Sequence, residues 1–240
     1  MFRNDYIVRM IEQFSITLGT LLGLKRELKP QEALELIGET YKRLFGLNPG
    51  LIRALSERDL ADLLSRSGEA TDEKLLVIAG LMKEEAELSL ILDRTGDSYR
   101  LNVKALNLTL MAAREQSAIP WMDVSGQIGE LLDLLAGYEL PPSSKQLLWP
   151  YFESEGRLAD AEDVLFELLD ECADGEAADG NDAKACGEWV EQALQFYERL
   201  LELPEDVLEA GNLPLGEVRD GLAEVRKMAA DRGAEAQPPS

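Results

Sequence analysis

Apolar side chains recur every three or four positions along most of this chain, in blocks that glycine and proline separate. This spacing places them on one face of an α-helix, where they can form a core. The first block shows the pattern clearly, with Ile7, Met10, Ile11, Phe14, Leu18, Leu21 and Leu22. Alternating runs rich in Val, Ile, Thr and aromatic residues, which would indicate strands, are missing. The sequence therefore predicts an all-α protein of about 9–11 helices.

Local start and stop signals set the expected helix boundaries. A first helix over residues 4–22 should end at Gly23, and a second over residues 30–45 should end at Gly46. Asn48-Pro49 breaks the chain, and the segment from Ser56 to Asp59 resembles a capping box that opens a short helix. Further helices are expected over residues 72–94, 98–115, 123–137, 184–203, 205–210 and 214–230, with another hairpin turning at Gly156.

Three expected hairpins share a pattern after the turn. Counted from Leu28, Gly96 and Gly156, the fifth, ninth and twelfth positions hold Ala33, Ile37 and Thr40, then Leu101, Ala105 and Leu108, then Ala161, Leu165 and Leu168. A small residue followed by apolar residues is similar to the second helix of a tetratricopeptide (TPR) repeat, although Leu101 departs from it. The turns are also too far apart for a regular array of about 34 residues. We therefore predict TPR-like stacked hairpins that form an α–α superhelix, or right-handed solenoid, with intervening helices that are degenerate repeats or insertions.

Several segments also resemble an uncharacterised family of Gram-positive bacteria with TPR-like hairpins. They are residues 4–13 (NDYIVRMIEQ), 104–108 (KALNL), 161–169 (AEDVLFELL), 196–201 (FYERLL) and 209–214 (EAGNLP). Together they cover about residues 4–226. The resemblance implies a helical protein of unknown function and assigns no catalytic residue.

The domain prediction is a single TPR-like domain over residues 1–230. It divides into N-terminal helices (1–68), central hairpins (69–172), a flexible acidic loop (173–183) and C-terminal helices (184–230), before a disordered tail (231–240). The loop is predicted because residues 173–183 contain no large apolar side chain.

The net charge of −22 excludes several classes of partner. Such a surface repels nucleic acid and anionic membranes, and it attracts basic proteins or peptides; solubility alone is the plainer explanation. We expect no segment to reach the roughly 18 apolar residues of a membrane span, and the N-terminus lacks the features of a signal peptide. We expect a cytoplasmic protein.

The sequence offers little catalytic or metal-binding chemistry. It contains no His, and it lacks the glycine-rich phosphate-binding motifs and the serine-nucleophile motif. We therefore predict no catalytic residues, no cofactor and no metal. The acidic run between Asp170 and Asp182 does not fit the EF-hand spacing. Cys172 and Cys186 can form a disulfide across the acidic loop, but free thiols are the favoured prediction.

Stacked hairpins would line a groove with their first helices. The candidate partner-binding residues on this basis are Lys83, Leu90, Asp93, Arg94, Gln146 and Glu153. Lys83 and Arg94 are cations that can hold a carboxylate of a peptide. The competing interpretation is that they pair with local acids such as Glu84, Glu87 or Asp97.

These observations favour a non-catalytic scaffold that binds a protein or peptide, with no nucleic-acid or membrane partner. Two alternatives stay open. One is a structural protein whose first or last helix forms a homodimer, and the other is a module that senses a small molecule or peptide. An enzyme that uses carboxylates alone is the least favoured hypothesis.

Overall fold

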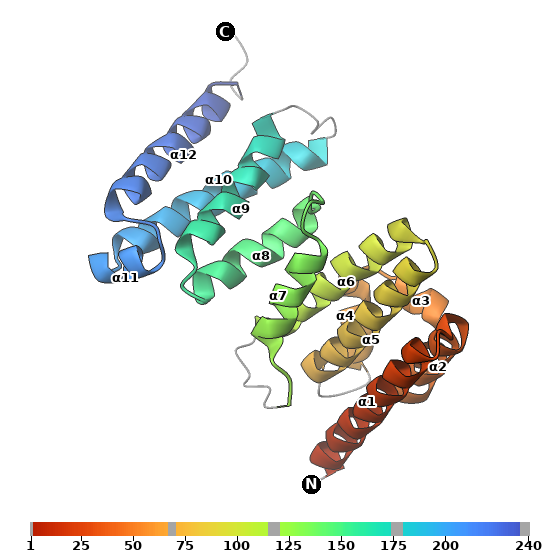
Figure 1. Cartoon of the computed structure of the whole chain (residues 1–240). Coiled ribbons are helices and arrows are strands. Elements are labelled where there is room, and N and C mark those ends of the chain that lie inside the picture. Colours follow the sequence, from red (N-terminus) through yellow and green to blue (C-terminus); the bar gives the residue numbers. More distant parts are fainter. Residues whose placement is uncertain (1, 67–70, 115–120, 174–179, 236–240) are drawn as a thin grey trace. The chain divides into compact units, whose positions relative to one another are not determined.

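The computed structural model describes residues 2–66, 71–114, 121–173 and 180–235 (Figure 1). Within these ranges the chain is all-helical: it has 12 helices and no strand, and 84% of it is helix. The all-α prediction is therefore confirmed, with one helix more than the predicted range. A single domain was expected over residues 1–230, whereas the helices group into two compact units, residues 1–140 and 141–240. The prolines Pro141 and Pro142 stand at the boundary.

The first unit contains seven helices. They are α1 (Phe2–Arg26), α2 (Pro30–Phe45), α3 (Pro49–Ala54), α4 (Glu57–Arg66), α5 (Thr71–Ile91), α6 (Thr95–Ala113) and α7 (Val124–Leu134). Helix α5 is central, because it contacts α1, α2, α4 and α6. Residues 74–82 are consecutively buried, and an all-round buried helix is expected at the centre of a helical core.

Strong local signals set several boundaries as predicted. Helix α2 begins at Pro30, and Gly46 ends it in the left-handed conformation at φ 68°. Ser56 caps α4 as expected, since the Asp59 N–H donates to Ser56 Oγ at 3.1 Å, and the Ser56 hydroxyl in turn donates to Asp59 Oδ2 at 2.6 Å. The chain does leave the helical conformation before Asn48-Pro49, but the short helix α3 that begins there was not predicted: Asn48 caps it by accepting from the Leu51 N–H at 2.8 Å.

Two helix ends differ from the prediction. Helix α1 passes through Gly23 and ends before Leu28, and α5 ends before Asp93, so Gly96 lies inside α6. Leu28, Asp93 and Gly156 adopt positive φ values of 57°, 58° and 73°. After each of them the next N–H bonds to a carbonyl five residues back: Lys29 to Leu24, Arg94 to Ser89 and Arg157 to Phe152. This is the Schellman motif, whose left-handed residue is usually glycine, as at Gly156, but is Leu28 or Asp93 at the other two turns.

The corrected turn restores the small fifth position that Leu101 seemed to break, but it places the polar Asn102 at the ninth position, where the prediction had an apolar or small residue. The fifth residues after the three turns are now Ala33, Ser98 and Ala161, which are all small and buried. The twelfth residues, Thr40, Ala105 and Leu168, are each 0% exposed. A repeated hairpin pattern therefore exists, although it does not by itself establish a TPR-like superhelix.

Among the described helices, residues 5–26 are long and apolar enough to cross a membrane by length and composition alone. The expectation that no segment reaches this length was therefore wrong. Core helices of soluble proteins and signal sequences share these properties. One face of α1 is buried within the unit through Met10, Phe14, Thr17 and Leu21.

The second unit contains α8 (Pro142–Ser154), α9 (Leu158–Ala173), α10 (Gly180–Leu201), α11 (Glu205–Ala210) and α12 (Leu215–Glu235). Helices α8 and α9 form the predicted hairpin at Gly156, and α12 packs on α10. Helix α12 continues to Glu235, so the disordered tail predicted from residue 231 was wrong for residues 231–235. Residues 236–240 lie outside the described residues.

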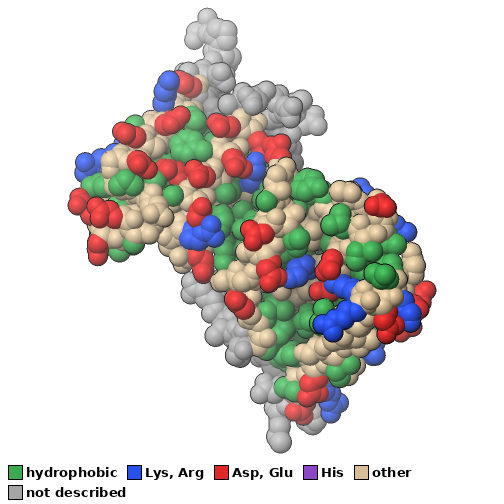
Figure 2. Space-filling model, viewed as in Figure 1, with side chains coloured by type: hydrophobic (Ala, Val, Ile, Leu, Met, Phe, Trp, Pro, Cys, Tyr) green, Lys and Arg blue, Asp and Glu red, His purple; other side chains and the backbone are tan. Residues whose placement is uncertain are grey.

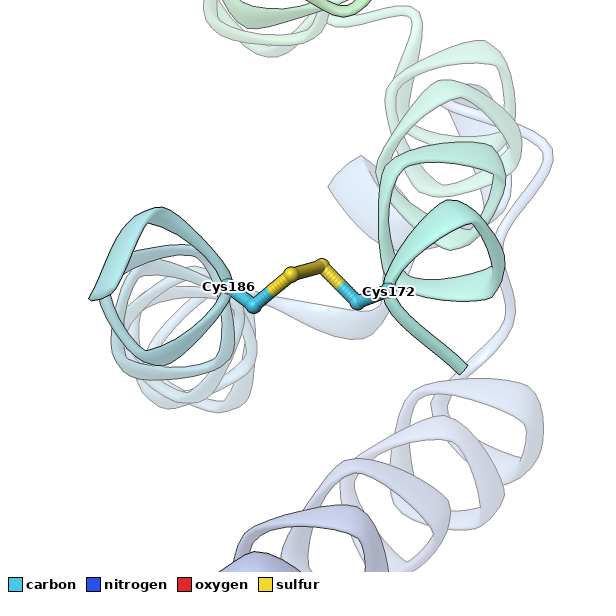
Figure 3. Close-up of a disulfide and its surroundings, with 2 residues drawn as sticks. All are labelled: Cys172 and Cys186. Atoms are coloured by element: carbon cyan, nitrogen blue, oxygen red, sulfur yellow. A yellow bond between two sulfur atoms is a disulfide. The ribbon is translucent and has the colours of Figure 1, made fainter. Parts of the chain in front are cut away.

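The two cysteines are bonded, contrary to the prediction of free thiols. Figure 3 shows Cys172 on α9 and Cys186 on α10 facing each other, and their Cα atoms lie 5.7 Å apart. The disulfide closes the segment predicted as an acidic loop. Residues 180–183 of that segment belong to α10, and residues 174–179 lie outside the described residues.

Candidate functional site

A cavity of about 270 Å³ lies in the first unit, between α2, α3 and the α5–α6 hairpin. We call it the cationic pocket, because its wall contains Arg53, Arg94, Arg100 and Lys104. Only two acids, Glu85 and Asp97, line it with them. Positive charge therefore exceeds negative charge here, although the chain has 46 acidic and 24 basic residues.

Glu85 forms the acidic floor of the pocket. It is 2% exposed, and its Oε1 forms an ion pair with Arg53 Nη2. Burial raises the pKa of Glu85, while Arg53 and the nearby Tyr41 hydroxyl oppose that rise. Neither Glu85 Oε2 nor the Tyr41 hydroxyl makes a hydrogen bond of normal geometry. The floor is therefore a buried carboxylate that Arg53 holds beside the Tyr41 hydroxyl.

Lys104 joins the pocket to the end of α3. Its Nζ donates to the carbonyl oxygen of Arg53 at 3.2 Å and to that of Leu55. These carbonyls lie at the C-terminal end of a helix, where a cation is favourable. Burial lowers the pKa of Lys104, and the charge of Glu57 partly opposes this. Lys104 therefore holds α3 against α6 and adds positive charge to the wall.

Arg94 is the cation best placed to accept a ligand. It precedes α6 and is exposed, and its side chain makes no ion pair or hydrogen bond with another described residue. The neighbouring acid, Asp97, is already paired with Arg100 at 2.8 Å. A guanidinium without a partner can bind a carboxylate or phosphate through two parallel hydrogen bonds.

The predicted site residues in the first unit separate into two groups. Arg94 lines the cationic pocket, and Asp93 forms the turn beside it. Leu90 is 53% exposed near the end of α5. Lys83 is elsewhere, because it forms an ion pair with Glu130 of α7. Its partner is thus an acid, but not one of the local acids considered from the sequence.

Gln146 and Glu153 belong to α8 in the second unit. Gln146 is half-buried, and Glu153 is held by Arg199 of α10 through two contacts of 2.8 Å, Nε to Oε1 and Nη2 to Oε2. This bidentate pair connects α8 to α10. Glu153 is therefore occupied by an internal contact.

Sequence reasoning missed Arg53, Arg100 and Lys104. Arg53 lies on α3, and the signal that could have revealed this helix is Asn48 followed by Pro49, a helix cap followed by a favoured first residue. Arg100 and Lys104 share one face of α6, but nothing in the sequence indicates that α3 lies opposite them.

The described side chains include no group of three or more His, Cys, Asp or Glu residues that could hold a metal ion. Most of the acidic run considered for calcium lies outside the side chains that the structure describes.

A model of the family of unknown function DUF6483 matches residues 1–230. The chain belongs to the DUF6483 family. No curated protein matches it, and no solved structure matches it. Because the function of the DUF6483 family is unknown, this membership assigns no activity to the chain.

Proposed function

We propose that this DUF6483 protein is a non-catalytic helical scaffold that binds a protein or peptide segment in the cationic pocket. The observation that carries the proposal is the concentration of four cations around one cavity in a strongly acidic chain. Figure 2 illustrates the acidic background, with Asp and Glu side chains spread over the visible face.

A partner that binds this pocket should present an acidic residue to it. Arg94 supplies a free guanidinium, and Leu34 and Leu101 supply apolar wall next to it. A carboxylate next to an aliphatic side chain would pair with the guanidinium and pack on the apolar wall. The basic partner expected from the net charge remains a prediction for the rest of the surface, where long-range attraction governs the encounter rate.

The residue types of the chain favour a binding role over catalysis. The chain has no His, and both cysteines are in the disulfide. Lys104 donates to two carbonyl oxygens, so its amine is engaged rather than poised as a base.

Selection from a displayed peptide library tests the proposal with the intact protein. We expect wild type to enrich peptides that share an acidic residue beside an aliphatic one. Arg94→Glu should lose this enrichment, whereas Arg58→Glu, the same charge reversal at an exposed position of α4, should keep it. Equal enrichment by the two variants, or no shared motif with wild type, would refute binding at the pocket.

The same cavity supports the alternative of a small-molecule sensor. Its volume of about 270 Å³ is close to the lower limit of small-molecule sites, about 300–1,000 Å³. A thermal-shift series with small carboxylates and inorganic phosphate distinguishes the two functions, because a sensor should be stabilised by a free anion without any peptide.

A further inference from the structure

Helix α1 carries an exposed face with two large apolar side chains, which no described residue of its own unit covers. Ile16 is 61% exposed and Leu22 is 55% exposed, whereas Phe14 and Leu21 on the opposite face are buried. The two exposed residues flank one stripe of the helix, which Glu12, Ser15, Gly19, Gly23 and Arg26 complete. We call these seven residues the α1 stripe. Helical spacing of three and four places them along one side of the helix.

The two glycines of the α1 stripe have no explanation within the chain. A Cβ at Gly19 or at Gly23 would meet nothing within 4 Å. A glycine inside a helix costs about 1 kcal/mol relative to alanine. Both glycines therefore lower helix stability without enabling a contact inside the unit. They do allow a second helix backbone to approach closely, as small residues do where helices cross.

The charges of the stripe are arranged symmetrically about Gly19. Glu12 precedes it by seven residues and Arg26 follows it by seven, which corresponds to about 10 Å along the helix in each direction. Both side chains are exposed, and neither makes an ion pair with another described residue. Two antiparallel copies that cross at Gly19 would place each Glu12 opposite the partner's Arg26.

We infer that the α1 stripe is a homodimer interface in which a second copy of this chain packs antiparallel, with Gly19 on the two-fold axis. Ile16 of one copy then lies against Leu22 of the other, and Ser15 lies against Gly23. A two-fold interface requires such self-complementarity, because the same surface is used twice. A parallel pairing would instead bring two Glu12 carboxylates together and two Arg26 guanidinium groups together.

A lipid bilayer fits the stripe less well than a second copy does. To cross a bilayer, α1 would have to leave α2 and α5, against which it packs. It would also carry the carboxylate of Glu12 into hydrocarbon, which costs several kcal/mol. The dimer should nevertheless be weak, since a single helix pair buries less than the roughly 1,600 Å² of a standard interface and two copies of charge −22 repel each other.

Sedimentation velocity of the full chain tests the interface, at about 5–500 µM protein and about 150 mM NaCl to screen the net charge. We expect a reversible monomer–dimer equilibrium for wild type. Glu12→Lys and Arg26→Glu should each weaken dimerisation about tenfold or more. The two-fold axis repeats the Glu12–Arg26 pair, so each single change turns two attractive pairs into two repulsive ones. The double variant Glu12→Lys/Arg26→Glu should regain most of the wild-type affinity, since the opposite charges are exchanged and not lost.

Glu209→Lys controls for the change in net charge, because it makes the same reversal at an exposed position of α11. Circular dichroism checks that each variant is folded, and Leu22→Gln weakens the apolar contact without any charge change. A monomeric wild type over the whole range would overturn the inference, as would a double variant no better than the single ones. Wild-type binding to zwitterionic lipid vesicles that Leu22→Gln abolishes would assign the stripe to a membrane and also overturn it.

Discussion

Replacing Gly221 by alanine tests how closely α12 packs on α10. A Cβ at Gly221 would lie 2.6 Å from Cζ and 2.8 Å from Cε1 of Tyr197, and closer still to its hydroxyl. Tyr197 is 0% exposed, and its hydroxyl donates to Glu162 Oε1 at 2.5 Å. At these distances the extra methyl must displace either the buried ring or the helix.

The expected loss in the free energy of unfolding is the sum of three contributions. Overpacking a core by one methyl costs about 1–3 kcal/mol. Displacement of the Tyr197 hydroxyl from Glu162 weakens a charge-assisted hydrogen bond, which contributes about 1.5–3 kcal/mol. Alanine recovers about 1 kcal/mol through its higher helix propensity. We therefore expect Gly221→Ala to lower the free energy of unfolding of the second unit by about 2 kcal/mol.

Urea denaturation followed by tryptophan fluorescence measures this change. A Trp121→Phe background leaves only Trp149 and Trp189, which both report on the second unit. Gly187→Ala is the matched control, because Gly187 lies on α10 with open space at its Cβ. We expect it to stabilise the unit by about 0.5–1 kcal/mol.

A double-mutant cycle then assigns the loss to the clash. Tyr197→Phe removes the hydroxyl, so Gly221→Ala should cost less in that background than in the parent. If Gly221→Ala unfolds at the same urea concentration as the parent, the proposed packing is wrong; if its effect is unchanged in the Tyr197→Phe background, the hydroxyl and its bond to Glu162 contribute nothing to the loss.

Three further predictions concern the disulfide, a buried carboxyl and the core of the first unit. Replacing Cys172 and Cys186 by serine should lower the stability of the second unit by about 3 kcal/mol in urea denaturation, because the bond closes a loop with a sequence separation of 14, while Trp121 fluorescence should stay unchanged. Burial raises the pKa of Glu162, so the folded state favours its protonated form; stability should therefore rise as pH falls from the folded pKa towards about 4.5, and Glu162→Gln should remove this dependence in melts between pH 4 and pH 8. Gly80→Ala should lower the melting temperature, since the new Cβ would lie 2.6 Å from Cζ of the buried Phe14, and an unchanged value would contradict the packing of α1 on α5.

The helix boundaries that could be predicted are those that local chemistry decides. Pro30 and Gly46 bound α2 because a proline is favoured at a helix start and a glycine at a left-handed end. Gly23 was predicted to end a helix and Gly96 to form a turn, but both lie inside helices. The turns use Leu28 and Asp93 instead, where the Schellman hydrogen bond and the packing of neighbouring helices outweigh the preference for glycine.

The pocket was predictable only in part, because its wall comes from helices far apart in the sequence. Arg94 could be selected as a cation at a hairpin turn. Arg53, in contrast, reaches the pocket from α3, a short helix that the sequence pattern did not predict. The disulfide was missed for a related reason, since the spacing of the two cysteines does not show that α9 and α10 face each other.

Ion pairs in this chain illustrate why partners are hard to assign from sequence. With about two acids for every cation, each lysine has several acids nearby, and Glu84 and Glu87 were the natural candidates for Lys83. In the folded unit both acids bind Lys25 of α1 at 2.6 Å, and Lys83 pairs with Glu130. Each of these lysines connects two helices, so packing chooses the partner, and sequence proximity does not. A cation near a cavity that packing leaves without a partner is therefore a better guide to a binding site in such a chain than a cation picked from the sequence.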